Sequence, residues 1–443
     1  MRHPAIAGLA SVLLILAASV DAAAQAREWT LAQCVDHAVA NSNTIRQRQI
    51  AMEMRENDLS TSRGGHLPTV SAYAGQSFDF GRGLTVDNTY ANRNTRNTSM
   101  GIQASVPLFE GFRTVNGVKV ARLNLAAATE DLAAAKEDLG IGVAQAFLRV
   151  LSTKEIALRT EEQVRLSEAQ LERREALYAN GKTSESEVYA ARSLVAQDEM
   201  TAVGAANDYR LALLDLSQLL ELPSPDSIAV VSPDTSALAL GEFPLPDEIF
   251  REALASKPGI RAAQARAESA ERQIAVAKGA YSPSLTLSGG VSTGYYAMSG
   301  QDGDSFGKQL DNNLNKSVSL SLSIPIFSRF ASRNGVRSAK MSYTSSLVDL
   351  EEARKTLYKE IQQAYYNAVA SRATFESSRA AAESAEAAFR LAEARYASGL
   401  SSSTDYAEAR TNRIVALANM IQYKYDMLFR GKILDFYRGA ELR

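Results

Sequence analysis

The sequence contains the same half-protein twice. The segment LYANGKTSESEVYAAR at residues 177–192 returns as RYASGLSSSTDYAEAR at 395–410. At the same offset, VPLFEGFRTVNGVKVAR at 106–122 aligns with IPIFSRFASRNGVRSAK at 324–340. Each copy is about 200 residues long, far above the roughly 20–50 residues of a solenoid repeat. The chain is therefore expected to fold as two similar halves, and a structural expectation for one half applies to the other.

A proline-rich stretch separates the halves, and such a stretch cannot be helical throughout. Its prolines are Pro223, Pro225, Pro233, Pro244 and Pro246. We therefore assign repeat 1 to residues 27–222, the link to 223–246 and repeat 2 to 247–443.

Residues 1–26 have the parts of a secretory signal peptide. Arg2 and His3 precede an apolar run at 5–18, and Ala24-Gln25-Ala26 forms a small-residue cleavage site. The sequence therefore predicts export with cleavage after Ala26. No later segment approaches the ~20 consecutive apolar residues of a membrane-spanning helix, which argues against a helical inner-membrane protein.

Each half has one long stretch suited to a single helix. Residues 336–398 contain neither proline nor glycine, and the matching residues 118–180 contain two glycines and no proline. At about 1.5 Å per residue, each stretch would span roughly 95 Å. A sustained heptad predicts that these helices supercoil around neighbours as hairpins at about 113–220 and 331–438, although an ordinary antiparallel coiled coil would have the same pattern. The heptad residues of the first half are Val118, Leu125, Leu132, Leu139 and Ala146.

Strict alternation of apolar and small polar residues marks strands in both halves. In SVSLSLSIPIF, serines alternate with Val318, Leu320, Leu322 and Ile324. Alternation over ~9–11 residues with a polar opposite face is typical of strands in a membrane β-barrel. We predict strands at about 69–80, 99–109, 283–296 and 316–327.

The connections between these strands fit the same interpretation. Residues 81–98 and 297–315 are rich in Asn, Asp, Gly and Arg, as expected of extracellular loops. Aromatic residues near the other strand ends should form a girdle at the lipid headgroups: Phe109, Phe112, Phe327 and Phe330. A set of four strands cannot close, since bacterial outer-membrane barrels have at least about eight and open edges are not tolerated in hydrocarbon. Several chains must contribute to one barrel.

These features together resemble the TolC-like outer-membrane efflux proteins, also called outer membrane factors. The resemblance rests on WTLAQCVDHAVANSNTIRQ near the start, the two P-[LI]-F junctions between strand and helix, and the two Y-A-x-G-x-x-S breaks. It covers essentially all of the mature chain. The duplication combined with this order of elements makes the resemblance specific.

The resemblance implies a mixed, internally duplicated fold. Long antiparallel α-helical hairpins would form a periplasmic α-barrel, and each chain would add its four strands to a shared trimeric transmembrane β-barrel. It also implies a homotrimer in the cell outer membrane, in contact with outer-membrane lipid. Its partners would be a periplasmic adaptor (membrane fusion protein) and an inner-membrane pump. No cofactor is expected.

The two repeated breaks are expected to be turns at the far ends of the long helices. Gly181 and Gly399 would supply backbone freedom at the reversal. A serine side chain would cap each returning helix, with Ser184 or Ser186 in the first copy and Ser402 or Ser403 in the second. The resemblance implies that these tips form the periplasmic mouth and dock the adaptor, at Gly181, Ser184, Gly399 and Ser402.

The resemblance also implies a gate at the mouth, with an acidic ring and tyrosines that hold it closed. The matching residues are Asp405, Glu408, Glu187, Tyr178 and Tyr396. A basic residue that some members have just after the second glycine is absent, because Leu400 and Ser401 stand there. For Glu187 an ordinary role as a solvated acid at a helix N-terminus is equally compatible with the sequence.

Other functional classes fit poorly. The formal net charge of −2 suggests no nucleic-acid partner. No H-E-x-x-H, paired C-x-x-C, G-x-S-x-G or phosphate-binding glycine loop occurs, so the chain is not expected to be an enzyme. The single cysteine, Cys34, is expected to be a small buried residue of the first helix, not a lipidation site, and it excludes an intrachain disulfide.

The expected function is that of a passive exit duct in a tripartite efflux pump or a type I secretion system. The alternative is a structural or adhesive coiled-coil protein anchored in the outer membrane.

Overall fold

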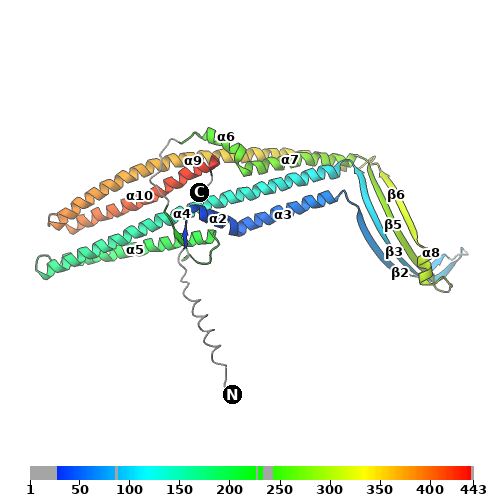
Figure 1. Ribbon diagram of the computed structural model, residues 1–443, viewed down its shortest axis with the longest axis horizontal. Helices are drawn as coiled ribbons and strands as arrows, with labels where there is room; N and C mark the ends of the chain where they lie inside the picture. The colour runs from blue at the N-terminus through cyan, green and yellow to red at the C-terminus, as the bar shows by residue number, and fades with distance from the viewer. Residues whose placement is uncertain (1–26, 85–87, 226–227, 233–242, 441–443) are drawn as a thin grey trace, which may run out of the picture. The chain divides into compact units, whose positions relative to one another are not determined.

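The computed structural model describes residues 27–84, 88–225, 228–232 and 243–440 (Figure 1). The expected signal peptide and parts of the expected proline-rich link lie outside the described residues. The described residues divide into two compact units: unit 1 lies within 27–49, 132–258 and 354–440, and unit 2 lies within 50–131 and 259–353. Each unit therefore combines segments of both sequence repeats.

The two repeats form the same series of helices. Each begins with two shorter helices, α2 (Leu31–Asn41) and α3 (Asn43–Gly64) in repeat 1 and α6 (Pro246–Ser256) and α7 (Pro258–Lys278) in repeat 2. A helix of 67 residues follows the strands in each repeat, α4 (Arg113–Ala179) or α9 (Ala331–Ala397). It is followed by a helix of 35 residues, α5 (Glu185–Leu219) or α10 (Ser403–Tyr437). None of the helices in the described part of the chain has both the length and the apolar character needed to cross a membrane.

Unit 1 has a continuous apolar core among its helices. The fully buried side chains Phe147 of α4, Leu216 of α5 and Ile421 of α10 contribute to one cluster. Full burial of such a side chain stabilises the fold by about 1.5–3 kcal/mol. Cys34 lies in the same cluster, fully buried, and burial raises the pKa of its thiol to about 12. Its place in the core agrees with the expectation from the sequence.

A small parallel sheet in unit 1 was not predicted. Strand β1 (Arg27–Trp29) pairs with β4 (Ile228–Val230), which lies within the expected proline-rich link. Trp29 and Val230 are buried in the core cluster. Strands of three residues are too short to show the alternation that reveals a strand in the sequence.

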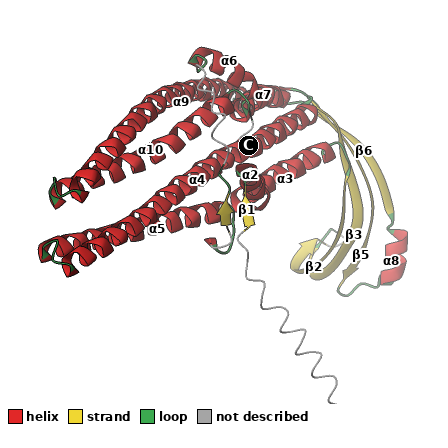
Figure 2. Cartoon of the chain, turned by 60° about the vertical axis from the view of Figure 1, so that its left-hand side comes forward, coloured by secondary structure: helices red, strands yellow, loops and turns green. Residues whose placement is uncertain are grey.

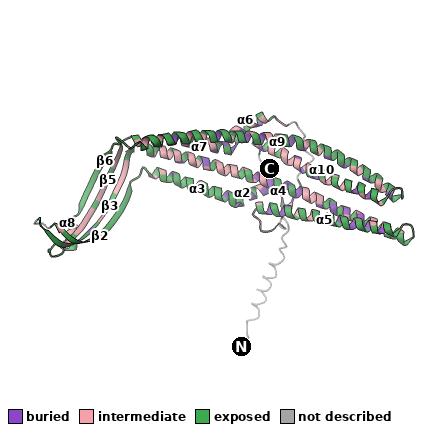
Figure 3. Ribbon diagram, turned by 180° about the vertical axis from the view of Figure 1, so that it is seen from behind, coloured by how far each residue is buried: buried purple, intermediate pink, exposed green. Residues whose placement is uncertain are grey.

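Unit 2 contains the four-stranded antiparallel sheet, in the order β2-β3-β5-β6. Its strands are β2 (Thr69–Leu84), β3 (Tyr90–Glu110), β5 (Ser284–Met298) and β6 (Asn315–Ser323). The first hairpin continues well into residues 81–98, which the sequence suggested as a loop. The reason is that backbone pairing continues as far as Leu84 opposite Tyr90, whatever the polarity of the side chains. Both edge strands, β2 and β6, are exposed along almost their whole length (Figure 3).

The two P-[LI]-F junctions differ in structure. Pro107 stays inside β3, where the pairing with β5 has an irregularity between Pro107 and Phe109. In the second repeat β6 ends at Ser323, before Pro325, and so is shorter than the expected strand at 316–327. Proline has no N–H to donate to a ladder and is tolerated in sheets mainly at bulges and edges, which accounts for both outcomes.

Both junctions nevertheless share one unusual backbone conformation. Phe112 and Phe330 have φ angles of 63° and 65°. Each packs edge-on against the preceding phenylalanine, with ring centroids 5.5 Å apart for Phe109–Phe112 and 5.8 Å apart for Phe327–Phe330. Because positive φ is unfavourable for a bulky residue, its recurrence at equivalent positions indicates that the turn from strand to helix requires it.

A short helix, α8 (Phe306–Asn312), covers the edge of β5 beyond the end of β6 (Figure 2). The Gln309 side chain accepts from the Tyr296 N–H at 2.9 Å and donates to the Tyr296 carbonyl at 3.0 Å. Asn313 donates to the Gly294 carbonyl at 2.7 Å. These amides satisfy backbone groups that a partner strand would otherwise pair, so an exposed strand edge is avoided.

Candidate functional site at the two helical tips

The candidate site comprises the turns between the long and shorter helices of unit 1. We call residues 177–187, between α4 and α5, the first tip, and residues 395–405, between α9 and α10, the second tip. Both long helices end in a Schellman motif. In the first tip Gly181 N–H donates to the Tyr178 carbonyl and Lys182 N–H to the Leu177 carbonyl, at 2.8 and 2.9 Å.

The second tip repeats this motif. Gly399 N–H donates to the Tyr396 carbonyl and Leu400 N–H to the Arg395 carbonyl, at 3.2 and 2.8 Å. Gly181 and Gly399 have φ angles of +67° and +76°, a region that residues with a Cβ atom avoid. The two glycines therefore occupy the reversal positions expected from the sequence.

The returning helices begin differently. Ser402 accepts from Asp405 N–H at 3.1 Å, and the Asp405 carboxylate accepts from Ser402 N–H at 3.3 Å, which forms a capping box. Ser184 occupies the matching N-cap position but makes no side-chain cap bond, and its hydroxyl lies 2.8 Å from the Ser186 hydroxyl. The capping box lowers the pKa of Asp405, chiefly through the Ser402 hydroxyl, so this carboxylate is charged at neutral pH.

Glu187 occupies the position in the first tip that Asp405 occupies in the second. Its carboxylate, however, bonds to the other tip and not to its own helix cap. Its carboxylate accepts a hydrogen bond of 2.6 Å from the Tyr396 hydroxyl, which joins the two tips. The Arg174 guanidinium lies over the Tyr396 ring, 3.9 Å from its centroid. Burial first, and then the bond to Glu187, raises the pKa of Tyr396 to about 12, so its hydroxyl remains a donor at neutral pH.

Tyr396 is also held by aromatic packing. Its ring stacks on Tyr406, with centroids 4.8 Å apart and planes 15° from parallel, and Tyr406 in turn contacts Phe389. All three rings are buried, and Leu166 of α4 and Leu194 of α5 pack against them. Such stacking fixes the direction of the Tyr396 hydroxyl toward Glu187.

Farther from the turns, a buried ion pair joins the two helical hairpins. The Arg410 guanidinium of α10 contacts the Asp198 carboxylate of α5, and their side chains are 3% and 4% exposed. Gln163 of α4 donates to the same carboxylate at 3.5 Å. The Nε of Arg410 is buried without a hydrogen-bond partner. Removing either charge would leave the other buried and unpaired, which makes this pair sensitive to mutation.

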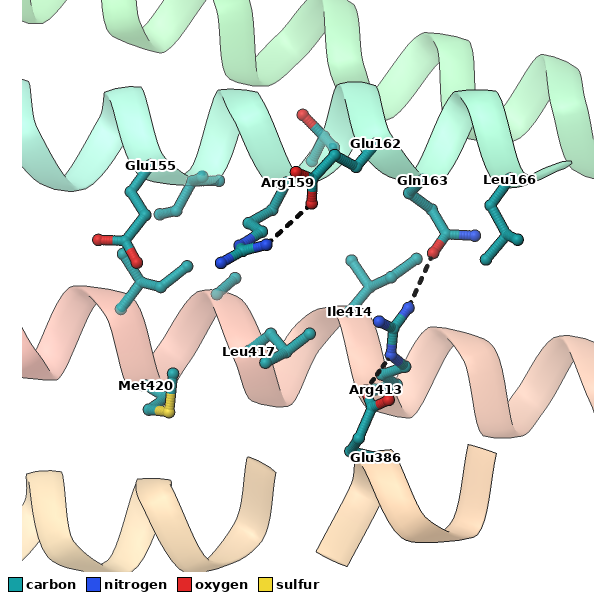
Figure 4. Close-up of a pocket in the computed structure, with 14 residues that line it drawn as sticks. Glu155, Arg159, Glu162, Gln163, Leu166, Glu386, Arg413, Ile414, Leu417 and Met420 are labelled. Carbon is teal, nitrogen blue, oxygen red and sulfur yellow. Dashed lines mark hydrogen bonds and ion pairs between the residues drawn. The ribbon is translucent and has the colours of Figure 1, made fainter. Parts of the chain in front are cut away.

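The polar network extends into a groove lined by α4, α9 and α10 (Figure 4). Arg413 of α10 bridges Glu386 of α9 and Gln163 of α4, with a bond of 3.2 Å to the Gln163 carbonyl oxygen. The groove encloses about 420 Å³ and has the apolar residues Ile414, Leu417 and Met420 along one side. The described residues contain no group of His, Cys, Asp and Glu side chains suited to a metal ion.

The structure brings together only some of the residues that the sequence singled out. Tyr396 and Glu187 are in direct contact, whereas Tyr178 and Glu408 are exposed and Asp405 is engaged in its own helix cap. Five further residues of this site were not predicted from the sequence: Arg174, Tyr406, Asp198, Arg410 and Arg413. One signal was available, because Arg410 is the final residue of the repeated segment, with Arg192 as its counterpart.

Comparison with known proteins places this architecture in a family. The sequence matches the family described as outer membrane efflux protein over residues 34–221 and 249–433, one match for each repeat. It is similar to Protein CyaE of Bordetella pertussis, with 26% identity over 92% of this chain and 83% of that protein. It is also similar to the outer membrane efflux protein BepC of Brucella suis, with 22% identity over 95% of this chain and 87% of that protein.

A solved structure has the same fold. The CmeC outer membrane channel of Campylobacter jejuni superposes with a TM-score of 0.77 and 20% identity, over 93% of this chain and 86% of that one. The family match covers most of both repeats, and the fold consists of the expected helical hairpins and four-stranded sheet. The chain therefore belongs to the outer membrane efflux protein family, and it is an outer-membrane protein with a periplasmic helical part.

Proposed function

We propose that the protein is a passive exit duct, a homotrimer that receives substrates from a periplasmic adaptor and an inner-membrane pump and releases them outside the cell. The observation that carries this proposal is the sheet with two unpaired edges, β2 and β6. Such edges are not tolerated in hydrocarbon, and three copies of a four-stranded sheet would supply enough strands to close a barrel. The names of BepC, an efflux protein, and CmeC, a channel, support the same assignment.

We infer that the two tips form the periplasmic mouth and that the contact between Tyr396 and Glu187 holds it closed. The contact joins the two hairpins at their ends, and the Arg174 guanidinium over the Tyr396 ring strengthens it. A mouth held by a few polar contacts can open when an adaptor binds the tips more tightly in the open state. Residues Gly181, Ser184, Gly399 and Ser402 belong to the exposed surface of the turns that an adaptor would meet.

The exposed acids Asp405 and Glu408 are proposed to line this mouth. In a homotrimer these two residues would contribute six carboxyl groups to a ring. The pKa of Asp405 is lowered by its hydrogen bonds to Ser402, so the three Asp405 side chains are charged at neutral pH. A ring of carboxylates in a pore favours cations over anions. The Ser402 cap does not neutralise this charge, because a hydrogen bond to a carboxylate stabilises the ionised form.

Single-channel recordings in planar bilayers test the acidic ring. The double variant Asp405→Ala, Glu408→Ala should lose cation selectivity and become less sensitive to block by multivalent cations. Glu352→Ala, an exposed acid on α9 far along the chain from Gly399, is the matched control and should behave as wild type. Unchanged selectivity in the double variant would contradict the placement of these acids at the pore.

Deletion of the gene tests the duct itself. Loss of an exit duct should increase sensitivity to dyes, detergents or antibiotics, or abolish secretion of a protein. A strain with unchanged sensitivity and an unchanged set of secreted proteins would instead favour a structural or adhesive role.

A further inference from the structure

The sheet of unit 2 has one apolar and one polar face. Pairing places Ala72, Ile102 and Val291 side by side, and directly paired residues lie on the same face. The opposite face is polar, with Gln103 and Ser292 among its residues. In an outer-membrane barrel the apolar face contacts lipid.

The direction of the chain identifies the outward end of this face. The ends of the strands near Glu110 and Ser323 continue into α4 and α9, which belong to the periplasmic part. The ends near Leu84, Tyr90 and Met298 are therefore nearest to the cell exterior. At this end the apolar face changes from aliphatic residues to aromatic and basic ones.

We name this region the outward patch and define it by Phe78, Arg82, Tyr90, Arg96, Tyr295 and Phe306. The Arg96 guanidinium lies between two rings, 5.9 Å from the Phe78 centroid and 5.7 Å from the Tyr295 centroid. Arg82 lies 6.0 Å from the Tyr90 centroid. Phe306 of α8 packs on Tyr295, with centroids 5.1 Å apart. Phe78 and Tyr90 are 58% and 67% exposed, so the patch is open to its surroundings.

The charges on this face have one sign. Lys316 lies on the same face as Arg82 and Arg96, because it pairs with Val291. The acidic residues of the four strands are Asp79 and Glu110. Asp79 accepts from Ser77 and Thr95 on the polar face, and Glu110 lies at the periplasmic end. Among the described residues, neither guanidinium of the patch has a carboxylate within ion-pair distance.

Guanidinium groups that lie on a lipid-facing surface and have no carboxylate of a described residue beside them indicate an anionic partner at the level of the lipid headgroups. Arginine binds phosphate with two parallel N–H donors, and stacking on aromatic rings leaves the edge of the guanidinium free to do so. Aromatic side chains are most stable at the level of the headgroups, where their rings meet sugars and the first carbons of the acyl chains. The patch thus combines guanidinium groups, which bind phosphate, with aromatic rings, which contact sugars and acyl chains. A phosphorylated glycolipid has all of these parts.

We propose that the outward patch binds a phosphate group on the headgroup of an outer-leaflet glycolipid, with Arg96 and Arg82 as the phosphate ligands. Another copy of the chain does not fit as the occupant. Strand pairing between copies would use the edges of β2 and β6, whereas Arg96 is on β3, which already has partners on both sides. Arg82 is on β2, but its side chain lies on the lipid-facing side of the sheet with Arg96 and not in the plane of strand pairing.

Native mass spectrometry of the full-length protein in detergent tests the proposal. The probes are bis-phosphorylated lipid A, its monophosphoryl form and the zwitterionic phosphatidylethanolamine. The wild type should retain bis-phosphorylated lipid A best, and the double variant Arg82→Gln, Arg96→Gln should bind it about tenfold more weakly. Lys308→Gln removes a basic residue that pairs with Asp304 at the same end of the sheet, and it should bind as the wild type does.

The outcomes separate the possible occupants. Equal retention of the three lipids by the wild type would overturn the proposal, and so would equal retention of lipid A by the double variant. Displacement of lipid A by millimolar inorganic phosphate would indicate a site for free phosphate, which also contradicts a lipid site. If the double variant does not assemble, Arg96→Lys keeps the charge without the two-donor geometry, and it should still weaken binding. The comparison of the three lipids on the wild type requires no variant.

Discussion

The two helical tips have the same backbone but different side-chain environments. Each tip ends in a Schellman turn with glycine at positive φ. Side chains at equivalent positions nevertheless differ in their burial and in their contacts. Tyr178 is 46% exposed, whereas its counterpart Tyr396 is 8% exposed. Arg192 forms an exposed ion pair with Glu175, whereas its counterpart Arg410 is buried against Asp198.

This difference shows that the duplication provides the scaffold and that the asymmetry arises from where the hairpins meet. The second hairpin turns its repeated tyrosine and arginine toward the first hairpin of the same chain. The first hairpin leaves its own copies exposed. Variants at equivalent positions can therefore test each contact separately.

The largest difference is expected between the two repeated arginines. Arg410→Met should lower the free energy of unfolding by about 3–5 kcal/mol, because Asp198 is left buried without a partner. Arg192→Met is the matched control and should cost no more than about 1 kcal/mol, since its pair with Glu175 is exposed. Chemical denaturation of the detergent-solubilised protein measures both.

A rescue variant distinguishes an unpaired charge from a loss of packing. Asp198→Leu combined with Arg410→Met removes both charges and should recover most of the lost stability. If the double variant is no more stable than Arg410→Met alone, the ion pair is not the reason for the asymmetry.

The second difference concerns the repeated tyrosines. Tyr396→Phe removes the bond to Glu187 and should weaken the contact between the tips by about 1.5–3 kcal/mol, because the acceptor is a carboxylate. Single-channel recordings should then show larger or more frequent openings. Tyr178→Phe is the control in the same recordings, because the Tyr178 side chain is exposed and its hydroxyl makes no such bond to a described residue.

The same contact predicts a dependence on alkaline pH. The pKa of Tyr396 is raised from 10.0 to about 12 in the folded protein, so folding favours the protonated phenol. The resulting stabilisation is fully present below about pH 10 and is lost as the pH rises toward 12. Wild-type channels should therefore open more readily as the pH rises from about 10 to about 12. Tyr396→Phe channels should not show this pH-dependent increase in opening. An identical pH response in both proteins would contradict the role of the hydroxyl.

Much of the fold was predictable because its signals are local and repeated. The absence of proline over long stretches predicts the helices α4 and α9. The alternation of apolar and polar residues predicts β6 and the inner part of β3. The length of the first β-hairpin was not predictable, because polar residues such as Asn92 and Asn94 continue the ladder through their backbone alone. The contact between Tyr396 and Glu187 spans 209 positions, and its partner Arg174 has no counterpart in the second repeat. Such contacts depend on which faces of the hairpins meet, and periodicity does not specify that.

The third test addresses the backbone that the tips share. Gly399→Val and Gly181→Val should each cost about 1–2 kcal/mol, because a side chain disfavours the left-handed conformation. A Cβ atom at either position would meet no other atom within 4 Å, so the cost lies in the backbone and should be similar at the two tips. We expect weaker adaptor docking in pull-down assays while the protein remains assembled. A much larger loss at one tip would show that the two turns are not equivalent.

The smallest difference is expected at the N-caps. Ser402→Ala removes a side-chain acceptor for the Asp405 N–H and should lower the free energy of unfolding by about 1 kcal/mol. Ser184→Ala should change it by only a few tenths of that amount, because the Ser184 hydroxyl bonds to Ser186 instead of the helix backbone. We attribute this contrast to Glu187, whose carboxylate bonds to Tyr396 and makes no capping box with Ser184. Ser184→Ala should therefore become costly only in a Tyr396→Phe background, where Glu187 is free to turn back to its own helix. Thermal unfolding of the four combinations measures this coupling, and equal effects of Ser184→Ala in both backgrounds would show that the cap and the contact between the tips are independent.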